Sequence, residues 1–134
     1  MNRSEQNTFL HDQFWNFLKT ELISPNKRGV NYYQSGVVGA QFSHLINNSP
    51  LVLSQLNDLM PDLIIFSYGT NEAYEKNLNV TKYYDELNSF ISKLNEVLPN
   101  SAIIITTAPD TRSQGKTPPN QVIINDQLIK IAKS

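Results

Sequence analysis

The residues best suited to chemistry lie in a turn that follows an apolar run. Residues 61–74 read P-D-L-I-I-F-S-Y-G-T-N-E-A-Y, so Gly69, Thr70, Asn71 and Glu72 come directly after the apolar segment. Glycine permits a sharp turn with positive φ, and an Asn amide held at such a turn can donate to a developing oxyanion. The same spacing also fits an ordinary strand-to-helix turn in which Asn71 caps the next helix. Asn71 is therefore a candidate oxyanion donor with a structural alternative.

A second candidate turn lies at residues 36–40, which read G-V-V-G-A. A backbone N–H at such a turn, that of Gly39, can act as a second oxyanion donor. The alternative is a tight turn in which a small residue allows close packing. The G-x-x-G spacing lacks the third glycine of a dinucleotide-binding fingerprint, and no acidic strand end follows at the right distance. A dinucleotide cofactor is therefore not expected.

The chain alternates between amphipathic helices and short apolar strands. We expect three strands, at 30–35, 63–68 and 102–107. Helices are expected at 5–23, 81–98 and 121–132, with a short helix from about residue 40. A further helix should follow, with Ser49 as N-cap and Pro50 in its first turn. The helix after Ser49 should bury Val52, Leu56, Leu59 and Met60. The run at 63–68 is nearly continuously apolar, which is typical of a parallel strand covered on both faces.

Such alternation predicts one α/β domain over residues 1–134, with a parallel sheet, right-handed crossovers and helices on both faces. Ligands of such sheets bind beyond the carboxyl ends of the strands, which points to the loops at 36–41, 69–74 and 108–117. Three strands make a thin sheet, since about five are usual. The chain also begins and ends on an expected helix. We therefore expect a domain that is incomplete at both ends.

The composition excludes several classes of protein. The net charge is −1 and the basic residues are scattered, so no basic stripe is present for a nucleic acid. Cysteine is absent, which excludes disulfides, thiolate metal sites and a Cys nucleophile. No His, Asp and Glu residues show metal-ligand spacing, no apolar run approaches the ~20 residues of a membrane span, and the first residues lack the pattern of a signal peptide. We expect no cofactor and no metal, and we leave compartment and oligomeric state open.

The two turns and the order of the elements resemble the SGNH (Ser–Gly–Asn–His, or GDSL) hydrolase superfamily across nearly the whole chain. Gly39 matches the glycine of the family's second block, and Asn71, within G-T-N-E, matches its third block, G-x-N-D/E. The stretch G-T-N-E-A-Y, with Q-L-x-x-L-x-P-D upstream at 55–62, is similar to a bacterial branch related to carbohydrate and peptidoglycan O-acetylesterases.

The resemblance implies a three-layer α/β/α sandwich with a flavodoxin-like parallel sheet. It also implies a serine ester hydrolase domain that acts on small acyl esters, such as acetyl esters of a carbohydrate. In the family a Ser attacks the ester carbonyl and a His accepts its proton. Gly39 and Asn71 would then be two of the three oxyanion donors.

The sequence departs from the family at both ends. Nothing reads G-D-S, the block that supplies the nucleophile, and nothing reads D-x-x-H, the block that supplies the base and its orienting acid. Ser35 has no paired His to activate it. His11 and His44 are expected on helices as surface or packing residues, and Asp110 is expected to form a turn. We therefore expect very low ester turnover from this chain.

Two other functions are open at this point. A non-catalytic SGNH-like module would bind glycan through the same cleft, and Tyr32, Tyr33, Tyr68 and Tyr74 are candidates either for stacking on a sugar or for half-buried packing. A flavodoxin-like nucleotide or regulator domain would need a phosphate cradle or an acidic phospho-acceptor at the strand ends. Neither is evident in the sequence, so this reading ranks last.

Overall fold

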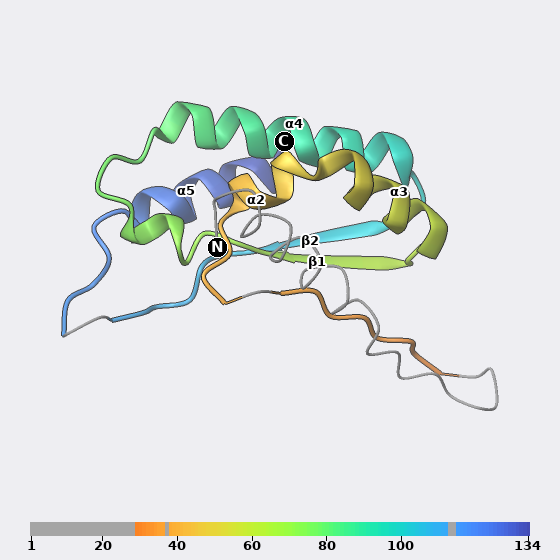
Figure 1. Cartoon of the computed structure of the whole chain (residues 1–134), viewed down its shortest axis with the longest axis horizontal. Coiled ribbons are helices and arrows are strands. Elements are labelled where there is room, and N and C mark those ends of the chain that lie inside the picture. The colour runs from red at the N-terminus through yellow and green to blue at the C-terminus, as the bar shows by residue number, and fades with distance from the viewer. Residues whose placement is uncertain (1–28, 37, 113–114) are drawn as a thin grey trace, which may run out of the picture. The chain divides into compact units, whose positions relative to one another are not determined.

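A computed structural model describes residues 29–36, 38–112 and 115–134 (Figure 1). The chain divides into two compact units, Met1–Ala40 and Gln41–Ser134, and each is described by itself. The expectation of a single domain over residues 1–134 stays a prediction. The helix expected at 5–23 lies outside the described residues.

The second unit has α/β architecture with a parallel sheet. Its elements, in chain order, are α2 (Phe42–Asn47), α3 (Ser49–Leu59), β1 (Leu63–Ser67), the 3₁₀ turn η2 (Glu72–Tyr74), α4 (Val80–Val97), β2 (Ala102–Thr106) and α5 (Gln121–Ile131). β1 and β2 pair in parallel, with Leu63 opposite Ala102 and Ser67 opposite Thr106. The predicted α/β class with a parallel sheet is confirmed, and these elements match their expected positions to within a few residues.

The longest helix, α4, forms where sequence signals agree. Asn79 caps it, because its side-chain oxygen accepts a hydrogen bond of 3.0 Å from the Lys82 backbone N–H. Its apolar residues recur at helical spacing and are buried as one stripe, comprising Tyr83, Leu87, Phe90, Ile91 and Leu94. No helix in the described part of the chain is long and apolar enough to cross a membrane.

Two details of α3 differ from the prediction. Its N-cap is Asn48 and its first helical residue is Ser49, so the helix begins one residue earlier than expected. Of the expected stripe only Val52 is buried, whereas Leu59 and Met60 are exposed. Met60 takes a left-handed conformation, with φ of 44°, in the turn that ends the helix. Helical spacing indicates which residues share a face, but how much of that face is covered depends on the neighbouring helices.

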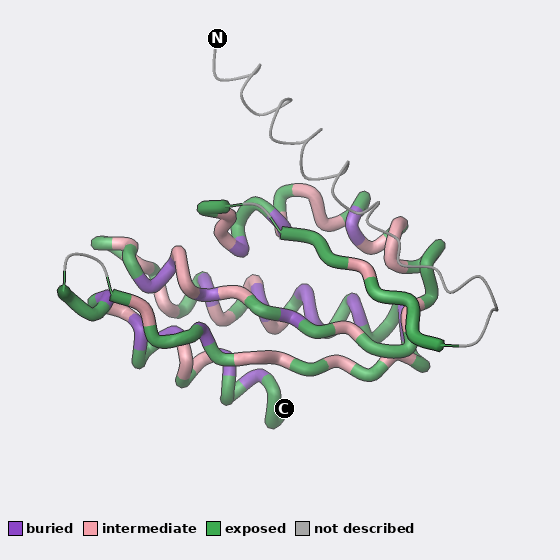
Figure 2. The backbone as a smooth tube through the Cα atoms, turned by 90° about the horizontal axis from the view of Figure 1, so that it is seen from below, coloured by how far each residue is buried: buried purple, intermediate pink, exposed green. Residues whose placement is uncertain are grey.

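The helices of the second unit all lie on one face of the two-stranded sheet (Figure 1). Figure 2 shows that buried positions lie mainly in the helices, while the strands are largely exposed or intermediate. Leu63, Ile65 and Ile104 alternate along the strands and are exposed, Ile65 to 58%. The expectation that the first apolar run is covered on both faces is therefore wrong for the described residues.

The strand expected at 30–35 is absent from the described residues of the first unit. Residues 30–36 have no regular secondary structure, and Val30 is 86% exposed. Strand propensity largely reflects packing against a neighbouring strand and a covered face. The β-favouring Val30, Tyr32 and Tyr33 are therefore not sufficient to make a strand.

The core is organised around the ring of Phe42, the first residue of α2. This side chain is 1% exposed. It makes edge-to-face contacts with four other rings, at centroid distances of 5.7 to 6.1 Å, and these belong to Phe66, Tyr68, Tyr83 and Phe90. Such pairs contribute beyond the area they bury. One side chain thus joins α2, β1 and α4.

We predict that Phe42→Ala lowers the free energy of unfolding by about 3–5 kcal/mol, because it removes a fully buried ring and leaves a cavity. Urea unfolding followed by circular dichroism measures this loss. Val122→Ala is the control, since Val122 is 70% exposed, and it should cost no more than about 0.5 kcal/mol. Equal losses in the two variants would show that the ring cluster does not hold the unit together.

Candidate functional site

Two loops meet at the carboxyl ends of β1 and β2. Because the strands are parallel and in register, the loops that follow them leave from the same edge of the sheet. The Tyr74 hydroxyl donates to Thr111 Oγ1 at 3.2 Å. The Asn120 backbone N–H donates to the Ala73 carbonyl at 3.1 Å, and its side-chain amide donates to the Glu75 carbonyl. The structure therefore brings together the predicted loops at 69–74 and 108–117.

Gly69 makes the sharp turn that starts the first of these loops. Its φ is +114°, a conformation that side chains rarely adopt. A Cβ at this position would lie 2.6 Å from Ile124 Cγ2 and 3.4 Å from Ala108 Cβ. Its carbonyl accepts a hydrogen bond of 2.9 Å from the Ala73 N–H. Glycine is thus required both by backbone conformation and by the close approach of α5.

Asn71 stands at the N-cap position of η2 in helical conformation, with φ of −77° and ψ of −36°. Its side chain makes no capping hydrogen bond. The true cap of the following long helix is Asn79. The structural alternative, in which Asn71 caps the next helix, is therefore not what the structure shows. Asn71 is half-buried at the turn where the sequence predicted an oxyanion donor.

Glu72, the residue after Asn71, is buried, which the sequence did not reveal. Its side chain is 4% exposed. One carboxylate oxygen, Oε1, accepts a hydrogen bond from the Phe42 backbone N–H, and the other, Oε2, is buried without a hydrogen-bond partner among the described residues. Next to it, the Gln41 side-chain amide donates to Glu75 Oε1 at 2.6 Å. The acidic residue after Asn71 was visible in the sequence, but its contact 30 residues away was not.

Two tyrosines beside this carboxylate have altered acidity. Burial, and secondarily the negative charge of Glu72, raises the pKa of Tyr68 to about 12. The same two causes raise the pKa of Tyr83 further above its ordinary value. The Tyr83 hydroxyl is buried and makes no hydrogen bond in the described part of the chain. Both phenols therefore stay protonated at neutral pH.

The remaining candidate residues fall in several places. Gly39 lies in the first unit with φ of +78°, which fits the predicted glycine turn. Ser35 and Asp110 are exposed, and His11 lies outside the described residues. His44 is exposed on α2, where its Nδ1 accepts a 2.9 Å hydrogen bond from the Gln41 N–H. His44 therefore has a local structural role, as the sequence suggested.

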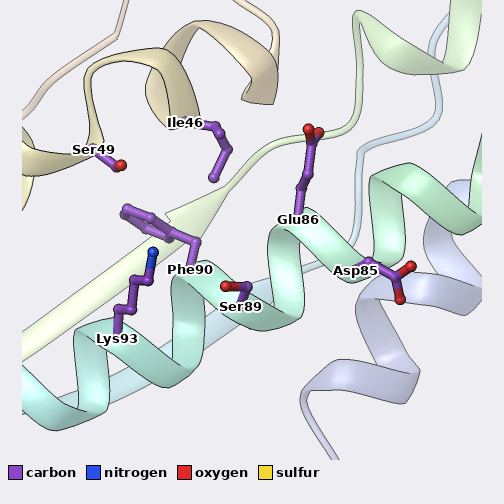
Figure 3. Close-up of a pocket in the computed structure, with 7 residues that line it drawn as sticks. All are labelled: Ile46, Ser49, Asp85, Glu86, Ser89, Phe90 and Lys93. Atoms are coloured by element: carbon purple, nitrogen blue, oxygen red, sulfur yellow. The ribbon is translucent and has the colours of Figure 1, made fainter.

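A cavity of about 260 Å³ lies elsewhere, against α4 (Figure 3). Its lining comes from α2, α3 and α4, and comprises Ile46, Ser49, Asp85, Glu86, Ser89, Phe90 and Lys93. It includes no residue of the loops after β1 and β2. Its two serines have no histidine beside them in the lining, so it offers no activated nucleophile. In the described residues, no group of His, Cys, Asp and Glu side chains could hold a metal ion.

Comparison with known proteins bears on the fold of the chain. No family model matches the sequence, and no curated protein does. Among solved structures, the fold is similar to that of a peptidoglycan O-acetylesterase, with a TM-score of 0.64 and 25% sequence identity. The match covers 71% of this chain and 29% of the other chain, so this chain spans less than a third of that protein's length. The likeness supports an SGNH-type hydrolase fold.

We predict that Gly69→Ala destabilises the chain by at least about 2 kcal/mol, because a left-handed φ and an overpacked Cβ each add a cost. Gly115→Ala is the matched control, since Gly115 has a positive φ of +76° but nothing within 4 Å of the added Cβ. Comparing the urea unfolding of the two variants separates the cost of the positive φ from the cost of the crowded Cβ. An equal loss in both would mean that the contact with Ile124 contributes nothing.

We further predict that the chain loses stability as pH rises above 10. The unfolded chain releases tyrosine protons near pH 10, whereas the folded chain holds those of Tyr68 and Tyr83 to higher pH. Deprotonation therefore favours unfolding, and the stabilisation present below pH 10 is lost as the pH approaches about 12.

The test is the urea midpoint at pH 8, 10 and 11 for wild type and Tyr83→Phe. The variant removes a buried hydroxyl that has no hydrogen-bond partner, so it should be at least as stable at pH 8 and should lose less stability at pH 11. Tyr32→Phe is the control, since Tyr32 is 55% exposed. A Tyr83→Phe profile parallel to that of wild type would contradict the prediction.

Proposed function

We propose that this chain carries the oxyanion-binding part of an SGNH-type ester hydrolase, with the Asn71 side-chain amide and the Gly39 backbone N–H as donors. The observation that carries the proposal is the turn at Gly69–Asn71. It lies at the carboxyl end of a parallel strand, and its Asn does not cap the following turn. The similarity to a peptidoglycan O-acetylesterase supports the reaction class.

The two donors would act when the ester carbonyl is attacked. Negative charge then develops on the carbonyl oxygen, and N–H groups aimed at that position stabilise the charge more than they stabilise the ground state. Both proposed donors can do this without changing protonation state. The sequence contains neither G-D-S nor D-x-x-H, so no residue of this chain is assigned as nucleophile or base.

The proposed substrate is a small acyl ester, most simply an acetyl ester on a carbohydrate. The O-acetylesterase likeness supports this class. Tyr74, at the same loop, is 38% exposed and is oriented by its hydrogen bond to Thr111. A partly exposed tyrosine held in this way can stack on a sugar ring.

A second candidate function is glycan binding without hydrolysis. The observation that favours it is the lack of a G-D-S or D-x-x-H block in the sequence. Both candidates use the same loops. Binding of O-acetylated peptidoglycan fragments, with p-nitrophenyl acetate turnover no faster than in buffer, favours the binding module. Turnover well above buffer favours the hydrolase and shows that the chain contains a nucleophile.

We predict that the donors bind acetate, the carboxylate product of acetyl-ester hydrolysis. In the ¹⁵N-labelled chain, acetate should shift the signals of the Asn71 side-chain amide and the Gly39 backbone amide in a saturable way. Asn71→Ala should weaken this binding about 10- to 100-fold, because a hydrogen bond to a charged group contributes about 1.5–3 kcal/mol.

The control for this titration is Asn57→Ala, since Asn57 is exposed on α3; it should bind acetate as the wild type does. Sodium chloride at equal ionic strength controls for salt. Acetate shifts that are confined to α4, or that persist unchanged in Asn71→Ala, would contradict the proposed donors.

A further inference from the structure

We infer that Glu72 is a positioning residue, whose carboxylate joins the start of α2 to the turn that carries Asn71 and thereby sets the position of that proposed oxyanion donor. The inference rests on the proposed function. Its structural basis lies wholly within the second unit, Gln41–Ser134. It assigns to Glu72 no contact with the reacting atoms.

The first argument is the burial of the carboxylate. Glu72 is 4% exposed, and in the described part of the chain no basic side chain forms an ion pair with it. A buried carboxylate without a cation is costly unless it accepts hydrogen bonds. Here one oxygen accepts from Phe42 N–H, whereas the other has no partner among the described residues. An apolar residue would avoid this cost, so the hydrogen bond to Phe42 is the reason for a carboxylate at this position.

The second argument is what the hydrogen bond connects. Glu72 directly follows Asn71, and the bond reaches the first residue of α2. A carboxyl oxygen is a good acceptor for a backbone N–H. Two further contacts act between the same segments: Gln41 donates to Glu75 at 2.6 Å, and the Phe42 ring lies 5.9 Å from that of Tyr68. The start of α2 is therefore held by three residues of the segment from 68 to 75.

The third argument is chain connectivity. Asn71 is attached to Glu72 by a single peptide bond. The carboxylate therefore acts directly on the turn that carries the proposed donor.

The test uses the full chain and three variants, Glu72→Gln, Glu72→Asp and Glu72→Ala. Gln keeps the length of the side chain and an acceptor oxygen, whereas Asp keeps the charge but is one methylene shorter. A positioning role predicts acetate affinity near that of wild type for Gln, and an affinity at least about tenfold weaker for Asp and Ala, equivalent to one lost hydrogen bond. A purely electrostatic role predicts the opposite order of acetate affinities, with Glu72→Asp near wild type and Glu72→Gln weaker.

Two more readouts separate positioning from a contribution to stability. Amide hydrogen exchange at Phe42 should become at least about tenfold faster in Glu72→Asp and Glu72→Ala, with the Asn71 side-chain signal shifted, while β1 and β2 amides keep their protection. Urea unfolding records any loss of stability separately. Glu86→Gln is the control, because Glu86 forms a surface ion pair with Lys82, and all readouts should match those of wild type.

Failure of the inference is distinguishable from failure of the proposed function. If wild type binds acetate at Asn71 and Gly39, and Glu72→Asp binds it equally well, the positioning role is overturned and the proposed donors stand. If wild type binds no acetate at these groups, the proposed function fails, and the inference, which rests on it, fails too. An Asn71 side-chain signal that is unchanged in Glu72→Asp overturns the positioning role, whether or not Glu72→Ala folds.

Discussion

The packing of the second unit depends on Phe42, which is held both through its ring and through its backbone N–H. The ring of Phe42 is enclosed by four aromatic neighbours from β1, the segment after it and α4, and its backbone N–H donates to the buried Glu72. The ring contacts bury a large apolar surface, and the directional hydrogen bond adds a fixed point to that packing, at the first residue of α2. Hydrophobic burial by itself is non-directional. The contact with Glu72 fixes the helix relative to the turn that carries Asn71.

In the turn after β1, Gly69 has a positive φ and is closely packed by its neighbours. Gly69 adopts a φ that other residues rarely take, and α5 approaches it so closely that no Cβ fits. Gln121 and Asn125 of α5 hydrogen-bond the backbone of Ala108, so the same helix that packs on this turn also holds the start of the loop after β2. The two strand-end loops are therefore both supported by α5.

The two-stranded sheet of the second unit is covered on one face. Helices cover one face of the two parallel strands, and apolar side chains on the other face are exposed. The neighbour described as a peptidoglycan O-acetylesterase is more than three times as long as the region it shares with this chain. The similarity therefore supports an SGNH-type fold, while activity and substrate belong to the proposed function.

The sequence alone determined what local pattern controls. Helical spacing located α4 and α5, apolar runs located β1 and β2, and the G-T-N-E motif located the turn after β1. Contacts between distant residues decided the rest. Residues 30–35 have strand propensity but no strand, because a strand needs a partner. Likewise, Glu72 is 30 residues from Phe42, so only the tertiary structure could show that this acidic residue is buried and holds α2. Its role depends on that distant N–H, which no local spacing reveals.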